Sequence, residues 1–176
     1  MKLAFSTLGC PDFDWTDIYT MAKDFGFSGI ELRGLGDDIF SIHARPFREE
    51  NLPETLSLLR SKHLEIPCLS TGCALKDTGR REETLAEIRE YIALAEKLGT
   101  PYIRILGDLT AAPMGEVDDE AVLSALKALV PDAEKAGVTL LVETNGVYSD
   151  TARLRDLLNR TESDNVAALW DVHHPY

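Results

Sequence analysis

GVTLLVETNG, residues 137–146, is a nearly continuous apolar run that turns polar at Glu143 and Asn145. A second stretch, NVAALWDVHH (165–174), follows the same order, with an apolar run that leads into an aspartate and two histidines. Apolar runs of this kind are typical of strands that are buried on both faces, as in parallel sheets. The two stretches therefore predict two parallel strands that carry reactive groups toward their carboxyl ends.

The rest of the chain alternates in the same way between short apolar segments and segments with helical spacing of apolar residues. Parallel strands need crossover connections, and helices usually supply them. The first predicted helix has Asp14 as its N-cap and Gly26 as its end. We expect strands at 2–9, 28–34, 64–72, 101–108, 137–146 and 165–174, and helices at 14–26, 52–63, 80–99, 118–136 and 150–160.

Two α/β architectures fit this alternation. The length of 176 residues favours an open, doubly wound sheet, because an eight-stranded barrel needs about 250 residues. However, the first strand-to-helix turn, residues 6–14, has no phosphate-binding glycine pattern, and glycine-rich turns of that type belong to the doubly wound dinucleotide-binding folds.

Polar residues at the end of every predicted strand favour the barrel. A barrel gathers all carboxyl ends of its strands around one mouth, whereas an open sheet has one crevice. The sequence therefore predicts a (β/α)8 TIM barrel, of which this chain covers about six βα units in one domain, residues 1–176. The strand-end groups are Ser6, Thr7, Glu31, Arg33, Ser70, Thr71, Arg104, Asp108, Glu143, Asn145, Asp171, His173 and His174.

Composition excludes several classes of protein. The chain has 44% hydrophobic and 27% charged residues, which is ordinary for a globular protein. Its formal net charge of -12 argues against nucleic acid as a partner. No apolar stretch approaches the roughly 20 residues of a membrane span, and the start of the chain does not read as a secretory signal. We expect a cytoplasmic protein whose three cysteines are reduced.

Glu143 and Asp171 form the most informative pair. By the period of two in strands, each is expected to point into the barrel, on strands about 4.8 Å apart. Two carboxylates in an apolar interior need a shared proton, an ion-pair partner such as Arg104, or a divalent cation. Alternatively, the two side chains cap the following helices. Oxygen ligands suit Mg²⁺ or Mn²⁺, and an added imidazole shifts the preference toward Mn²⁺, Co²⁺ or Zn²⁺.

SGIEL (28–32), LVETN (141–145) and LWDVHH (169–174) resemble the xylose isomerase-like βα barrels of the sugar phosphate isomerase/epimerase family. The resemblance implies a divalent-metal-dependent isomerase, epimerase or related dehydratase that acts on a sugar, sugar phosphate or cyclitol through proton abstraction and a metal-stabilised enediolate. It further implies that Glu143 and Asp171 bind the metal, that Glu143 is also the catalytic acid/base, and that His174 contacts substrate or metal.

Other polar and aromatic groups at the predicted mouth are expected to bind the sugar or polyol substrate. These candidates are Asn145, Arg104, Ser70 and Phe5. His173 is expected to face the barrel by strand alternation.

The chain also departs from the family pattern. The family's remaining ligands, a His near the seventh strand and a Glu on the eighth, have no counterparts here. We therefore expect either an excerpt of a longer chain or a fragment that associates through its open edges, for example as a homo-oligomer. Two other functions remain open: a non-catalytic sugar-binding or regulatory barrel, and a nuclease of the endonuclease IV type, which the acidic charge opposes.

Overall fold

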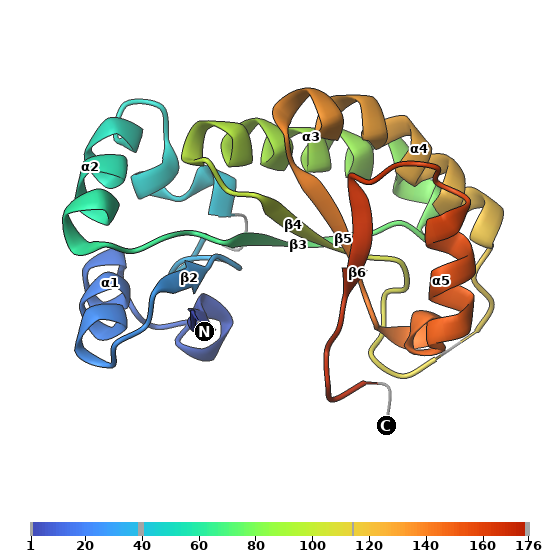
Figure 1. Ribbon diagram of the computed structural model, residues 1–176, viewed down its shortest axis with the longest axis horizontal. Coiled ribbons are helices and arrows are strands. Elements are labelled where there is room, and N and C mark those ends of the chain that lie inside the picture. The colour runs from blue at the N-terminus through green and yellow to red at the C-terminus, as the bar shows by residue number, and fades with distance from the viewer. Residues whose placement is uncertain (1, 39–40, 114, 175–176) are drawn as a thin grey trace.

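The computed structural model describes residues 2–38, 41–113 and 115–174. Helices and strands alternate along the whole of this region, as the sequence predicts (Figure 1). The strands are β1 (Ala4–Ser6), β2 (Gly29–Glu31), β3 (Cys68–Ala74), β4 (Tyr102–Leu106), β5 (Thr139–Glu143) and β6 (Val166–Leu169). The helices are α1 (Trp15–Asp24), α2 (Leu52–Lys62), α3 (Arg81–Leu98), α4 (Asp119–Ala136) and α5 (Thr151–Asn159).

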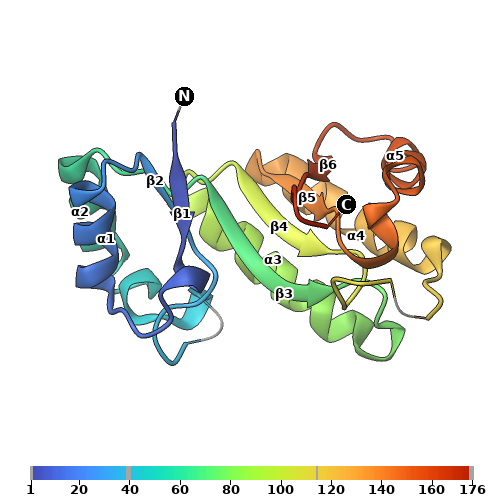
Figure 2. The ribbon, with the colours of Figure 1, turned by 90° about the horizontal axis from the view of Figure 1, so that it is seen from below.

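All paired strands are parallel and follow one another in sequence order. β1 pairs with β2, and β3 to β6 form a second parallel sheet. Leu32, just after β2, joins the two sheets: its N–H donates to Cys68 O at 3.1 Å and its carbonyl accepts from Ser70 N at 2.7 Å. The strands therefore form one arc, with the helices along its outside (Figure 2).

This arrangement excludes the doubly wound sheet. A doubly wound sheet reverses its strand order and carries helices on both faces, whereas here the order is sequential and the helices lie outside the arc. The described residues fold as five consecutive βα units and a sixth strand of a (β/α)8 TIM barrel, so the barrel is incomplete.

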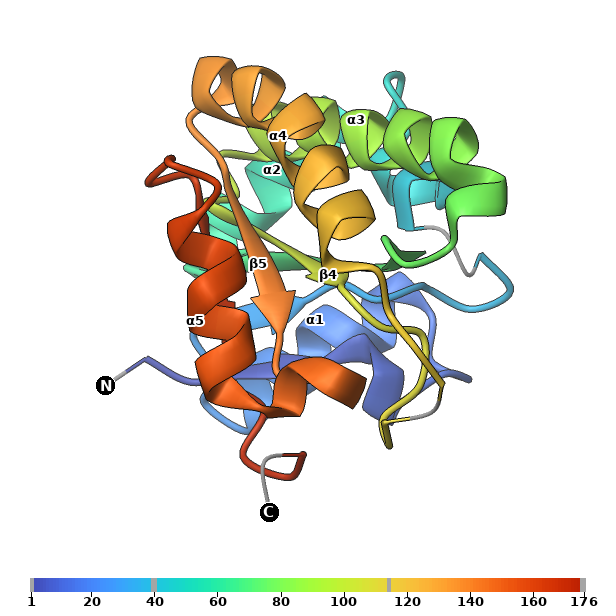
Figure 3. The same cartoon turned by 90° about the vertical axis from the view of Figure 1, so that its right-hand side faces the viewer.

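The hydrophobic core lies between the helices and the outer face of the strands, the face directed at the helices. Figure 3 shows this layering at one end of the arc, with α5 alongside β5 and α4 above. Alternate strand residues supply the core, since successive side chains point to opposite faces. Those with no exposed surface are Ile30, Leu32, Leu69, Ile103, Ile105, Leu140 and Val142.

Local signals set the helix ends. Asp14 forms the predicted cap, its carboxylate accepting from Asp17 N at 2.9 Å while the Asp17 carboxylate faces Asp14 N at 3.4 Å. Asp118 and Asp150 cap α4 and α5 in a similar way. The helices α3 and α4 end at glycines with left-handed backbone, Gly99 and Gly137. The three cysteines, Cys10, Cys68 and Cys73, are free thiols.

The predicted sixth strand was too long. β6 ends at Leu169, and residues 172–174 form a turn. Pairing with β5 stops where Thr144 N donates to Leu169 O at 2.9 Å. His173 lies in this turn and is exposed, so strand alternation does not decide which way it points. Trp170 and Val172, which continue the apolar pattern, are 66% and 72% exposed.

Candidate metal and substrate site

Glu143 lies on the inner face of β5, the face directed away from the helices. Its neighbour Val142 is buried on the outer face, so alternation turns the Glu143 carboxylate inward, where only 4% of the residue is exposed. Arg104 reaches the same place from β4. Its Nε and Nη2 pair with Glu143 Oε2, and its Nη1 donates to Thr71 O at 2.8 Å.

The Arg104–Glu143 ion pair is one of the three ways that the sequence offered for neutralising the carboxylate. Both side chains are largely buried, with 9% and 5% of their surface exposed. A buried guanidinium and carboxylate with complementary hydrogen bonds tolerate the low-dielectric interior, whereas either alone would not. Because Arg104 occupies Oε2, the second oxygen, Oε1, is the one directed toward the rest of the site.

Asp171 and His174 come to Glu143 from the turn that follows β6. His174 Nδ1 lies 3.7 Å from Glu143 Oε1 and 3.8 Å from Asp171 Oδ2. The candidate ligand atoms of Glu143, Asp171 and His174 all lie within 4.8 Å of one another. The structure therefore brings together both predicted metal ligands and the predicted substrate contact. We call these three residues the acidic cluster.

Asp171 also stabilises its own turn. Its Oδ1 accepts from His173 N at 2.8 Å, which leaves Oδ2 directed toward His174. Glu143 does not cap the helix that follows its strand, one of the alternatives that the sequence left open: Asp150 caps α5, and Glu143 is paired with Arg104.

Thr144, which the sequence reasoning did not single out, fastens the turn to β5. Asp171 N donates to Thr144 Oγ1 at 2.9 Å, and His174 Nδ1 lies 3.1 Å from Thr144 O. Thr144 N adds the last β5–β6 hydrogen bond, to Leu169 O. A hydroxyl residue directly after a strand-end carboxylate was the only signal in the sequence, and it is a weak one because such residues are common at strand ends.

The donor set of the acidic cluster fits a divalent cation. Two carboxylates and an imidazole with metal–ligand bonds of about 2.0 to 2.2 Å would lie roughly 3 to 3.6 Å apart around one ion, close to the observed 3.7 and 3.8 Å. Three protein ligands leave positions for water or substrate. His174 Nδ1 would first have to give up its contact with Thr144 O, because a nitrogen that donates a hydrogen bond offers no lone pair.

The other predicted substrate contacts are already engaged. Ser70 Oγ donates to the Glu31 carboxylate on the inner face. The Asn145 amide donates to Asp108 O at 3.1 Å, and only 3% of Asn145 is exposed. Phe5 is in register with Ile30 on the outer face and packs against Phe27 with ring centroids 5.1 Å apart. Phe5 is thus not brought to the acidic cluster, because strand alternation points it at the helices.

Asp108 explains why Asn145 is buried. Its carboxylate accepts from Lys76 Nζ at 2.6 Å, Leu109 N at 2.7 Å and Val147 N at 3.0 Å. Burial alone would raise the pKa of Asp108, but Lys76 and the two backbone N–H groups outweigh it and hold the pKa below its usual range. The network ties the end of β4 to the loop after β5.

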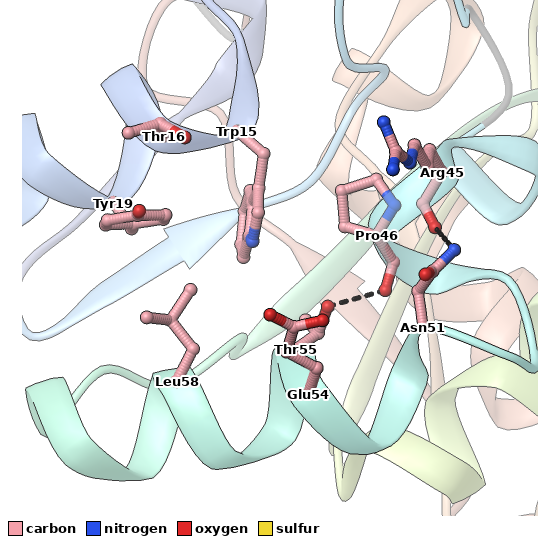
Figure 4. A pocket seen from close by; sticks show the side chains of 9 residues that line it. All are labelled: Trp15, Thr16, Tyr19, Arg45, Pro46, Asn51, Glu54, Thr55 and Leu58. Carbon is pink, nitrogen blue, oxygen red and sulfur yellow. Dashed lines mark hydrogen bonds between the residues drawn. The ribbon is translucent and has the colours of Figure 1, made fainter.

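A cavity of about 380 Å³ lies elsewhere, between α1 and α2. Figure 4 shows Trp15 and Tyr19 on one side of it and Thr55 on the other. The Thr55 hydroxyl donates to Pro46 O at 2.6 Å. No residue of the acidic cluster lines this cavity, so it is separate from the candidate site.

None of the helices in the described residues combines the length and the hydropathy that a membrane crossing requires.

Comparison with known proteins places these features in context. A family profile described as "xylose isomerase-like TIM barrel" matches residues 19–176. A search of curated proteins found no match.

Among solved structures, the probable 3-DHS dehydratase AsbF from Bacillus anthracis has a TM-score of 0.80 at 21% identity, covering 99% of this chain and 64% of that one. The 3-keto-D-glucoside 4-epimerase YcjR from E. coli has a TM-score of 0.78 at 16% identity, and the match covers 99% of this chain and 69% of YcjR. The IolI protein with a bound zinc atom has a TM-score of 0.73 at 18% identity, and the match covers 94% of this chain and 61% of IolI. The chain thus spans about two thirds of the length of these structures, and at these identities the likeness concerns the fold.

Proposed function

Because the chain belongs to the xylose isomerase-like TIM-barrel family, we propose that it is a divalent-metal-dependent isomerase, epimerase or related dehydratase acting on a sugar, sugar phosphate or cyclitol. The similar solved structures include a 3-keto-D-glucoside 4-epimerase and a probable dehydratase, which supports this range of reactions. The zinc atom in the IolI structure supports a divalent ion.

The observation that carries the proposal is the acidic cluster. Three groups with metal-ligand chemistry converge within 4.8 Å from two neighbouring elements, at the carboxyl ends of the strands where TIM-barrel enzymes have their active sites. Glu143 would hold the ion through Oε1 and Asp171 through Oδ2. A bound divalent ion would polarise a substrate carbonyl and stabilise the negative charge that develops on its oxygen.

In the proposed reaction Glu143 moves the proton. Its Oε2 is fixed by Arg104, which keeps the carboxylate plane in one orientation. The Glu143 carboxylate would take a proton from the carbon next to the substrate carbonyl and return it to another carbon, whereas return to the opposite face would need a second acid/base group. His174 would hold a substrate hydroxyl, with its ring oriented through Thr144 O. Burial excludes bulk water from Glu143, so the abstracted proton is not lost to solvent.

A non-catalytic sugar-binding barrel is the second candidate, and one observation favours it. Arg104 already neutralises Glu143, so this buried carboxylate does not depend on an ion for its charge balance. The two functions differ in metal binding and turnover, which makes them separable.

The test is a calorimetric titration of the chain with Mn²⁺, Mg²⁺, Co²⁺ and Zn²⁺, followed by a screen of ketose and inosose substrates. We expect one ion to bind, and Glu143→Gln and Asp171→Asn each to weaken it about tenfold or more. Glu83→Gln and Asp156→Asn are matched controls, since both side chains are exposed on helices. Equal affinity in all four variants would exclude the acidic cluster as the metal site. Metal binding without turnover of any substrate would favour the non-catalytic alternative.

A further inference from the structure

Arg33 lies beside Ser70 and Arg104 on the inner face. Leu32 and Leu69 form a parallel bridge, so the residues that follow them, Arg33 and Ser70, share the opposite face. Ser70 is in turn the partner of Arg104 across β3 and β4. With neighbouring strands about 4.8 Å apart, the backbones of the two arginines are roughly 10 Å apart, a gap that long guanidinium side chains can bridge.

The two arginines differ in their partners. Arg104 is committed to Glu143 and to Thr71 O. For the half-buried Arg33 side chain, no hydrogen bond or ion pair is found within residues 2–38, 41–113 and 115–174. Its backbone is nevertheless fixed: Arg33 N donates to Thr7 Oγ1 at 2.9 Å, and the same hydroxyl donates to Gly34 O at 2.8 Å. Arg33 therefore presents an available guanidinium from a defined position.

With a divalent ion at the acidic cluster, the charge around Arg33 would favour an anion. Burial lowers the pKa of Arg33, and the nearby positive charge of Arg104 lowers it further, while Glu143 and Glu31 act in the opposite direction. Glu31 and Glu143 surround the two guanidinium groups, and Asp171 of the acidic cluster adds a third carboxylate at the same end of the strands. A divalent ion at the acidic cluster would leave this set with an excess of one positive charge.

Space for a ligand group adjoins Arg33. A cavity of about 270 Å³ is lined by Arg33 together with Thr7, Cys10, Pro11 and Gly34. A water molecule takes up about 30 Å³ in the liquid, so the cavity has room for a carboxylate or phosphate group with several waters. It lies among the loops that follow β1 and β2, at the same end of the strands as the acidic cluster.

We propose that Arg33 binds an anionic group, a carboxylate or a phosphate, carried by the sugar or cyclitol on which the chain acts. This inference rests on the proposed function, because it assigns one end of the substrate to Arg33 while the other end reaches the acidic cluster. Guanidinium is suited to the task, since its planar fork matches both carboxylate and phosphate oxygens. Arg33 is thus the residue that selects charged over neutral polyols.

Direct binding tests the inference without turnover. Calorimetry or a thermal-shift titration would compare sorbitol, which is neutral, with gluconate and with sorbitol 6-phosphate, each in the presence of saturating metal. We expect the better of the two anionic polyols to bind about 10- to 100-fold more tightly than sorbitol. The ratio between gluconate and sorbitol 6-phosphate distinguishes a carboxylate subsite from a phosphate subsite.

Variants then locate the effect. Arg33→Gln should abolish the preference for the anion, Arg33→Lys should keep part of it, and Arg155→Gln, which removes an exposed arginine, should leave it unchanged. Unaltered circular dichroism would show that each variant is folded. Equal binding of neutral and anionic polyols, binding of none of them, or an anion preference that survives in both Arg33 variants would each overturn the inference. Metal affinity, measured separately on the unsubstituted chain, reports on the proposed function.

Discussion

Replacing Arg104 by methionine tests the charge balance of the site most directly. The change keeps much of the aliphatic stem but leaves the Glu143 carboxylate, in a residue only 4% exposed, without its counter-charge. Removing one partner of a buried ion pair costs about 3 to 5 kcal/mol, because the remaining charge is uncompensated. We expect a loss of this size in the free energy of unfolding, measured by urea denaturation followed by circular dichroism without metal.

The double variant separates this charge effect from lost packing. Arg104→Met combined with Glu143→Gln removes both charges, so it should be more stable than Arg104→Met alone, with a coupling energy of about 1 to 3 kcal/mol. A divalent ion should also restore stability to the single variant, by about 2.7 kcal/mol at 100 times its Kd.

Arg89→Met is the matched control, since Arg89 forms an ion pair whose side chains are 44% and 46% exposed. Exposed pairs contribute only about 0 to 1 kcal/mol. The reasoning would be refuted if Arg104→Met lowered the free energy of unfolding no more than Arg89→Met does. It would also be refuted if adding Glu143→Gln to Arg104→Met restored no stability, because the Arg104–Glu143 pair would then not balance a buried charge.

Three further predictions follow from contacts around the site. Thr144→Val removes the hydroxyl that accepts a hydrogen bond from Asp171 N, so metal affinity should fall about tenfold. Thr144→Ser keeps a hydroxyl and should restore the affinity. Equal metal affinity in the two variants would show that the Thr144 hydroxyl does not position Asp171. Gly146→Ala should lower the free energy of unfolding, measured by urea denaturation, by about 1 to 3 kcal/mol more than Gly115→Ala does. Both glycines have positive φ, but only at Gly146 would the new Cβ collide with the Asp108 carboxylate. Equal losses in the two variants would refute this. The pKa of Asp108 is lowered in the folded state, so its contribution to stability is present above the pKa of an unfolded aspartate and is lost as the pH falls through the folded-state pKa. Urea denaturation over that acidic range should show a smaller fall in stability for Asp108→Asn than for the wild type, and identical pH profiles would exclude the linkage.

The sequence predicted the order of elements because the buried outer face dictates it. Strand residues such as Leu140 and Val142 must be apolar to pack against helices, and the helices repeat apolar residues at the spacing that meets them. Helix caps such as Asp14 were equally predictable, since a cap depends on residues that are close in the chain.

The carboxyl ends of the strands were harder to predict. Trp170 and Val172 continue the apolar pattern, yet β6 stops at Leu169 because pairing with β5 stops there, and pairing is not a property of one strand alone. Asn145 was likewise expected to bind substrate at the mouth, but the chain turns after β5 and the Asn145 amide donates to Asp108 O. The availability of Arg33 could not be read from the sequence either, because it depends on which of two neighbouring arginines pairs with Glu143.

The division of each strand into an outer face packed against helices and an inner face with chemical groups has an evolutionary consequence. Consecutive positions of a strand are under different selective pressures, because one residue packs in the core, as Val142 does, and the next lies at the site, as Glu143 does. Substitutions at the inner positions can therefore diversify substrate preference while the apolar packing that keeps the scaffold folded is inherited unchanged.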